Sequence, residues 1–465
     1  MNNPFCNRRE FFQTGTAALT SALALHAEPA RFRHRGYLGW ITDLASQPDP
    51  HASWPSMRLD AALLEEYRRT FRLMRHLGYN EIVIWGFYVS RYWPADIPSA
   101  VTRERGALVE KLIDAAHNEG LRVYTGLGVY SWGFEQIIKA YPRLSRGNPR
   151  AMCGSLPEAW EWMQKVTDFV FTRFPIDGTS LQSADQGRCD CDQCRVYRDT
   201  EYHARLDIRV AEYIRSRWPG KTLAVSGWGM KLDDSAALPA LVNLSRNIDY
   251  LIDVSDSASR RDPAYRQKLI RQLSCAFGTV GGPQVEPPQH WQRDRWFLPT
   301  ARAQGEHLAR LHQDGGRACE YFFHIMANPG DELSFYVAGK ALADPATSWQ
   351  KHLAASIEEL YGTTNQSTVQ SLAELFVRAE NAYLQYLPTM RSGTLAMEPL
   401  ESDQPGPPVY ITRHLNPDQR ALYHAALESL AADFRKIASA VPDKSRIPTI
   451  LRCLANAQKD VAEPG

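Results

Sequence analysis

The chain has 465 residues, of which 44% are hydrophobic and 23% charged, a composition typical of folded globular proteins and unlike that of disordered chains. With 53 basic and 52 acidic residues the formal net charge is +1, which argues against a polyanionic partner such as nucleic acid. Aromatic residues make up 11% of the chain, and such rings either fill a core or pack against the C–H faces of sugars.

The first 27 residues have the pattern of an export signal. Arg8 and Arg9 resemble the pair of a twin-arginine signal, and the run Thr14–Ala27 behind them is short, small and weakly apolar. At 14 residues this run is too short to span a bilayer as a helix. We predict cleavage after Ala24 or Ala27 and a mature protein in the periplasm or outside the cell, without a membrane anchor. The alternative is an ordinary helix that happens to follow two arginines.

From Arg31 onward, strand-like runs alternate with amphipathic helical runs, the pattern of repeated βαβ units. The strand-like runs are, in chain order, Gly36–Ile41, Glu81–Trp85, Leu121–Leu127, Gly178–Gln182, Thr222–Gly227, Asp249–Val254, Cys275–Val280 and Ala318–Phe323. The first helical runs between them are Leu59–Leu77, Arg105–Asn118, Pro157–Phe171 and His203–Arg217. These units within residues 31–362 predict a (β/α)8 TIM barrel. The competing architecture is an open doubly wound sheet, but no glycine-rich phosphate-binding motif follows the first strand.

Beyond about Tyr361 the strand-like runs stop. Ser367–Leu387 and Pro417–Ala440 have the spacing of long amphipathic helices, and the proline-rich run Glu398–Pro408 separates them. Residues 363–465 are therefore predicted to form a small C-terminal helical region packed on the barrel.

Cysteines are crowded immediately after the fourth predicted strand, at Cys189, Cys191 and Cys194, and Cys153 lies in the loop that enters the preceding helix. Four thiolates from two adjacent loops could close a tetrahedral zinc site, which would brace the rim without taking part in chemistry. The alternatives are disulfides, because an exported protein meets an oxidising compartment, or unpaired thiols. Export by the twin-arginine route resembles a pathway for proteins that are already folded. A protein that folds before export could bind zinc in the cytoplasm.

Acidic residues follow or end several predicted strands, which is where barrel enzymes hold their catalytic groups. Asp185 follows the fourth strand, Asp253 ends the sixth, Glu286 follows the seventh and Glu320 lies on the eighth. Carboxylates that face one cleft can supply the proton donor and the base or nucleophile that glycosidic cleavage needs, without a cofactor. Each acid alone is more simply explained as a solvated loop residue or a helix cap, but their grouping at one rim predicts a site.

A second set of residues at or past the strand ends could contact a carbohydrate substrate. Its aromatic members could stack on sugar rings, and its polar members could bind hydroxyl groups or a carboxylate. Taken singly, each has a plainer explanation as a core residue or a partner in a surface salt bridge. The set consists of Trp85, Tyr88, Tyr130, Trp132, Gln182, Trp228, Arg293, His324 and Asn328.

Three motifs in the predicted barrel resemble those of a glycoside hydrolase clan. They are Asp177–Cys191 with its Gln-Ser-Ala-Asp-Gln-Gly-Arg-Cys-Asp-Cys end, Cys153–Glu158, and Asn328–Glu332. The clan includes the barrel β-N-acetylhexosaminidases and the α-glucuronidases, and the chain resembles an uncharacterised branch over about Gly36–Gly362. The resemblance implies a barrel fold, a carbohydrate substrate and a carboxylate acid after the fourth strand.

The resemblance also implies particular site residues. The hexosaminidases carry an Asp-Glu pair after the fourth strand, with Glu as the proton donor, and the matching pair here is Asp185-Gln186. A neutral amide cannot donate an acidic proton, which counts against acetamido-assisted chemistry. The α-glucuronidases are similar in carrying further acids at strands six and seven, matched here by Asp253 and Glu286. Two hypotheses follow: an exported glycoside hydrolase, or a catalytically silent glycan-binding protein on the same barrel.

Overall fold

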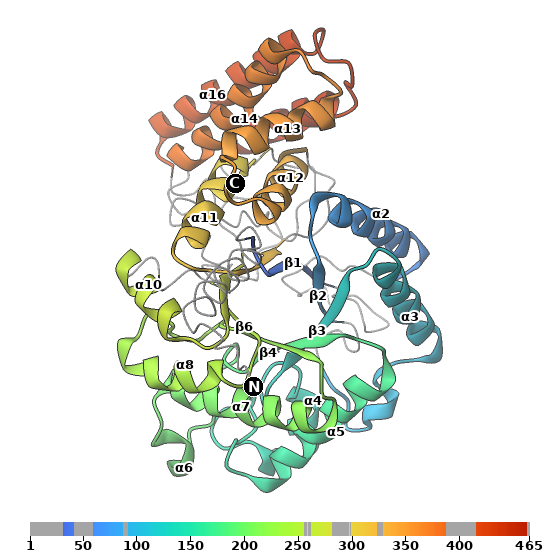
Figure 1. The fold of residues 1–465 in the computed structure, drawn as a ribbon, viewed down its shortest axis with the longest axis vertical. Helices are drawn as coiled ribbons and strands as arrows, with labels where there is room; N and C mark the ends of the chain where they lie inside the picture. Colours follow the sequence, from blue (N-terminus) through green and yellow to red (C-terminus); the bar gives the residue numbers. More distant parts are fainter. Residues whose placement is uncertain are drawn as a thin grey trace, which may run out of the picture. The chain divides into compact units, whose positions relative to one another are not determined.

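The computed structural model describes residues 31–40, 59–86, 92–254, 258, 262–280, 297, 299–322, 329–386 and 415–462. Their strands form a closed parallel barrel in the order β1 to β8, with β1 paired to β8 (Figure 1). The strands are β1 (His34–Trp40), β2 (Glu81–Trp85), β3 (Arg122–Gly128), β4 (Gly178–Gln182), β5 (Thr222–Ser226), β6 (Tyr250–Asp253), β7 (Ala276–Thr279) and β8 (Ala318–Phe322). The predicted (β/α)8 barrel is confirmed.

A helix follows each strand and packs on the outside of the barrel, as Figure 1 shows for the blue to yellow part of the chain. In chain order these helices are α2 (Ala61–Leu77), α3 (Arg103–Asn118), α5 (Pro157–Arg173), α7 (Asp199–Arg217), α8 (Leu238–Ser245), α10 (Pro263–Gln272), α11 (Ala301–Gln313) and α12 (Pro329–Ala343). Short helical turns lie in the loops: α4 (Glu135–Ala140), α6 (Asp192–Arg195), η1 (Ile97–Ala100), η2 (Pro142–Leu144) and η3 (Ser235–Ala237).

The bounds of α2 illustrate how local sequence sets these helices. The Asp60 carboxylate accepts a hydrogen bond from the backbone N–H of Leu63 at 2.9 Å and so caps the N-terminus. Gly78 ends the helix in the left-handed conformation, at a φ of 88°, and its N–H donates to the Arg75 carbonyl. Between these ends, side chains at helical spacing such as Phe71 and Met74 are fully buried in the main core.

Side chains that point inward from the strands fill the interior of the barrel. The interior is therefore a packed core and not a channel. Its apolar part consists of Leu38, Val83, Trp85, Tyr124, Ala224, Tyr250, Ile252, Val280 and Ala318. Polar groups share this interior, and they are described with the site below.

The C-terminal residues form α13 (Trp349–Tyr361), α14 (Gln366–Tyr386), α16 (Pro417–Ile437) and α17 (Ile447–Ala462). Helix α14 packs on α13 and α16, and α17 packs on α16 and α12.

Two polar contacts join these helices to the barrel. The Glu380 carboxylate accepts from the N–H groups of Arg302 and Ala303 at 3.0 and 2.9 Å, at the start of α11. Arg446 forms a two-point ion pair with Glu332 of α12 at 2.6 and 2.8 Å. Phe32–Gly465 accordingly form one compact unit.

The predicted export signal lies outside the described residues. None of the helices in the described part of the chain combines the length and the apolar character that crossing a bilayer requires.

Candidate functional site

The loop after β3 has an unusual backbone at the carboxyl rim of the barrel. Tyr130 and Trp132 adopt left-handed conformations, with φ of 61° and 51°, and Gly133 follows at 100°. For a residue with a side chain this conformation costs about 1–2 kcal/mol. Hydrogen bonds hold it in place: Met152 N–H donates to the Tyr130 carbonyl, and the Ser131 hydroxyl donates to the Ser183 carbonyl, both at 2.7 Å. Strain of this kind is concentrated at functional sites.

Two tryptophans meet at the mouth of the barrel. The Trp85 indole lies against Gly126, where an added Cβ would stand only 1.9 Å from its ring, so this strand position requires glycine. The rings of Trp85 and Trp132 are 4.9 Å apart and nearly perpendicular. Trp85 is 1% exposed, whereas Trp132 is half-buried. The structure therefore places Trp85 as a support beneath Trp132, and Trp132 is the ring of the pair that solvent reaches.

Asp185 lies in the turn directly after β4 and is half-buried. Loops on both sides hold this turn. From the β3 side, the Asn148 side-chain amide donates to the Gln186 carbonyl at 2.8 Å. From the β5 side, Gly229 packs so closely that an added Cβ would lie 2.6 Å from the Ala184 carbonyl oxygen. Trp228, next to Gly229, is half-buried as well. The structure thus brings the loops of Trp132, Asp185 and Trp228 together at one side of the rim.

The remaining described members of the predicted substrate set are buried. Gln182, the last residue of β4, is 4% exposed, and its backbone carbonyl accepts from Val129 N–H at 2.8 Å. Tyr130 is 1% exposed, and its hydroxyl accepts from the Arg209 guanidinium at 3.3 Å. Tyr130 therefore presents no open ring face at this rim.

A buried acid that the sequence analysis did not select supports the start of the Asp185 loop. Asp207 of α7 is fully buried, and its Oδ2 accepts a hydrogen bond from the Ser183 hydroxyl at 2.9 Å. Its Oδ1 is buried without a hydrogen-bond partner within the described ranges. Burial raises the pKa of Asp207 to about 8, only partly opposed by the bond from Ser183, so the carboxyl is neutral at neutral pH. The signal in the sequence is an acid on the apolar face of α7, between Leu206 and Val210.

Asp253 ends β6 but is committed to the backbone. It is 1% exposed, and its Oδ2 accepts from the N–H of Ala258 at 2.9 Å. The Asp253 carboxylate is therefore already used in a backbone contact, which makes it a weaker candidate for a catalytic role.

Glu320 lies inside the barrel, in the middle of β8 and beside a second acid. Gly36 pairs with both Glu320 and Glu81, and a Cβ added to it would lie in ordinary contact, at 3.5 Å, with the Cγ of each acid, so the two acids flank the same position of β1. Burial raises the pKa of Glu320 to about 8, and the charge of Glu81 adds to the shift, while contact with Tyr250 opposes it. Glu81 is paired with Arg122 at 2.6 Å and accepts from the Tyr124 hydroxyl at 3.2 Å. Sequence reasoning missed Glu81 because it opens its strand.

The remaining predicted site residues lie outside the described residues: Tyr88, Glu286, Arg293, His324 and Asn328. Their roles stay predictions from the sequence.

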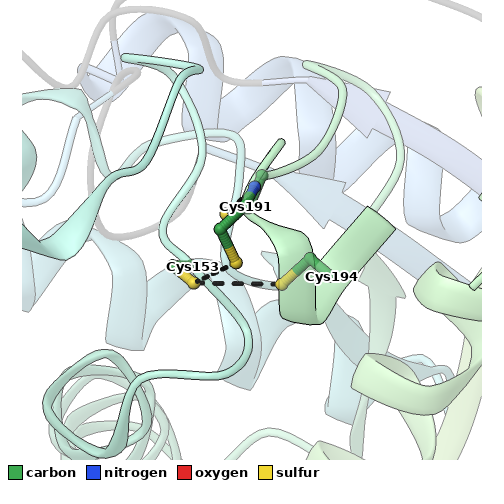
Figure 2. Close-up of side chains that lie close together, drawn as sticks. Cys153, Cys191 and Cys194 are labelled. Atoms are coloured by element: carbon green, nitrogen blue, oxygen red, sulfur yellow. Dashed lines mark hydrogen bonds between the residues drawn. The ribbon is translucent and has the colours of Figure 1, made fainter. Parts of the chain in front are cut away.

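The four cysteines of the predicted metal set converge at the same rim. All four Sγ atoms of Cys153, Cys189, Cys191 and Cys194 lie within 4.8 Å of one another. Figure 2 shows the side chains of Cys153, Cys191 and Cys194 pointing toward one another. Cys153 comes from the loop before α5, and the others come from the loop after β4, so the cluster joins the loop that carries Asp185 to the loop before α5. Disulfide bonds join none of these four described cysteines.

Comparisons with known proteins agree with this architecture. Neither a protein-family model nor a curated protein sequence matches the chain. Among solved structures, the chain is similar to a mutant of the Thermobaculum terrenum O-GlcNAc hydrolase, at 12% identity and a TM-score of 0.51, over 93% of this chain and 83% of that one. It is also similar to a GH138 enzyme targeting pectin rhamnogalacturonan II, at 11% identity and a TM-score of 0.58, over 93% of this chain and 57% of that one. The chain thus shares the barrel fold of these glycoside hydrolases, as the resemblance of its motifs predicted.

Proposed function

We propose that the chain is a glycoside hydrolase that cleaves glycosidic bonds in an oligosaccharide or polysaccharide by carboxylate acid/base catalysis. The observation that carries the proposal is the position of Asp185, in a turn at the carboxyl end of β4 that neighbouring loops hold from both sides. In (β/α)8 barrels this end of the strands is where catalytic groups project. The similar folds of two carbohydrate-cleaving enzymes support the substrate class.

In this proposal Asp185 is one of the two carboxyl groups that glycosidic cleavage requires, either as the proton donor or as the base or nucleophile. Glu286 is the proposed second group on the strength of the sequence alone. Asp253 is a weaker candidate because its carboxylate already binds the backbone of Ala258. Trp132 and Trp228 are proposed to stack on the sugar, since both rings are half-buried in loops adjoining that of Asp185.

The second candidate is a glycan-binding protein without catalysis. Gln186 favours it, because a neutral amide occupies the position where the resemblance implies a catalytic Glu. On this alternative the aromatic side chains at the rim would carry the whole function.

The deciding experiment screens the purified chain against aryl glycosides, aryl uronides and plant oligosaccharides, including pectin fragments, with glycan binding measured in parallel. We expect turnover of at least one substrate, and a loss of roughly 10²–10⁴-fold in kcat for Asp185→Asn. The matched control is Asp192→Asn, because Asp192 is a fully exposed acid of the same loop. Glycan binding without turnover would establish the second candidate, and near-normal turnover of Asp185→Asn would remove Asp185 from the mechanism.

We also propose that the chain is exported to the periplasm or the cell exterior. The proposal rests on Arg8 and Arg9 and the short apolar run behind them. An exported glycosidase would meet polymeric carbohydrate outside the cytoplasm, which agrees with the proposed substrate class.

A further inference from the structure

The four Sγ atoms of the cysteine cluster lie within 4.8 Å of one another, and two of their separations match those of thiolates around a single ion. The Sγ atom of Cys153 lies 3.6 Å from that of Cys191 and 3.8 Å from that of Cys194. A tetrahedral tetrathiolate site with Zn–S bonds of about 2.3 Å places its sulfurs about 3.8 Å apart. Both separations are well beyond the S–S bond length of about 2.05 Å.

Hydrogen-bond donors face two of the cluster sulfurs. The N–H of Cys191 donates to the Sγ of Cys189 at 3.4 Å, a contact that stabilises a negative sulfur. Cys191 and Cys194 are held on one helical turn, since Cys194 N–H donates to the Cys191 carbonyl at 3.0 Å. The Ser155 hydroxyl stands 3.0 Å from the Sγ of Cys153 and offers a further donor.

Positive charge lies next to the cluster. Four thiolates around a divalent ion carry a net charge of −2, which needs compensation when three of the ligands are buried. The Arg188 guanidinium donates to the carbonyls of Cys194 and Tyr197 and stacks on the Tyr202 ring at 4.4 Å. Its side chain is only 16% exposed, so this charge is fixed beside the metal ligands.

We propose that Cys153, Cys189, Cys191 and Cys194 bind one zinc ion in a closed structural site. Four sulfur ligands leave no coordination position for water or substrate, so the ion takes no part in catalysis. Its role is to fasten the loop before α5 to the loop after β4. Two hydrogen bonds also join these loops. The Asp190 N–H donates to the Arg146 carbonyl at 3.1 Å, and the Asn148 side-chain amide donates to the Gln186 carbonyl. The site thereby fixes the turn that carries Asp185.

The first test is metal content. The full chain is expressed with zinc and purified with its thiols reduced, and elemental analysis should find about one zinc ion per chain. Cys191→Ser should lose most of it. The matched control is Cys275→Ser, because Cys275 is a half-buried thiol in front of β7, outside the cluster.

The second test does not depend on how a variant folds. Wild-type chain loaded with Co²⁺ should show the intense visible bands of a tetrahedral tetrathiolate site, and Zn²⁺ should displace them at one equivalent. Absence of metal from the reduced wild-type chain even after incubation with Zn²⁺, one equivalent of iron in place of zinc, or Cys–Cys linkages in its mass spectrum would overturn the proposal. The result is independent of whether the chain hydrolyses a glycoside.

Discussion

Asp207→Asn should change how the stability of the protein depends on pH. The unfolded chain ionises this carboxyl near the ordinary value of 3.8, whereas burial raises its pKa in the folded chain to about 8. Between these values the folded chain holds one more proton than the unfolded chain, so its free energy of unfolding falls by about 1.4 kcal/mol per pH unit. Between pH 5 and pH 7 the Asp207 carboxyl therefore lowers the free energy of unfolding of the wild type by about 3 kcal/mol. Asparagine keeps the shape and the acceptor for the Ser183 hydroxyl but does not titrate.

The assay is urea denaturation of both proteins at pH 5, 6, 7 and 8. The free energy of unfolding of the variant minus that of the wild type should increase with pH across this range, and most of the increase should be complete by pH 8. Asp114→Asn is the control, because Asp114 is an exposed acid on α3, and its curve should run parallel to the wild type. Parallel curves for Asp207→Asn would mean that Asp207 is ionised in the folded chain, and the burial argument would fail.

Three further outcomes are expected. Trp132→Ala should raise KM roughly fivefold with little loss of kcat, because one stacking contact is worth on the order of 1 kcal/mol; an unchanged KM would remove Trp132 from the site. Gly126→Ala should lower the free energy of unfolding by about 1–3 kcal/mol, since its Cβ would displace the Trp85 ring, and tryptophan fluorescence should report the shift. Replacing both Arg8 and Arg9 by Lys should leave the protein in the cytoplasm of its host, as cell fractionation would show; normal export of that variant would exclude the twin-arginine route.

The sequence predicted the ends of the strands well where local turn residues mark them. Strands β2 and β4 have the predicted bounds because each is a short run enclosed by turn residues, such as Asp177 directly before β4. Strand β1 begins two residues before its predicted start, at His34, whose ring bonds Glu81 at 3.2 Å. That partner is 47 residues away and invisible to a local pattern.

The cysteine cluster was predictable because its residues lie close together in the sequence. The crowding of three cysteines indicated a cluster, and the barrel topology brought Cys153 to it from the neighbouring loop. The two buried acids Glu81 and Asp207 were missed for a different reason. An acid at the start of a strand or on a helix is by default exposed, and only the closed barrel shows that these two point into protein.

The contact of Glu380 with the start of α11 has a consequence for how this protein can be divided. Helix α11 lies between β7 and β8, yet the carboxylate that satisfies two of its first N–H groups belongs to α14, beyond the end of the barrel sequence. A gene truncated after residue 362 would encode every barrel strand and still leave that helix end without its acceptor. The C-terminal helices are therefore not an interchangeable module: recombination that exchanged them for those of another barrel would also have to supply an acceptor for these N–H groups.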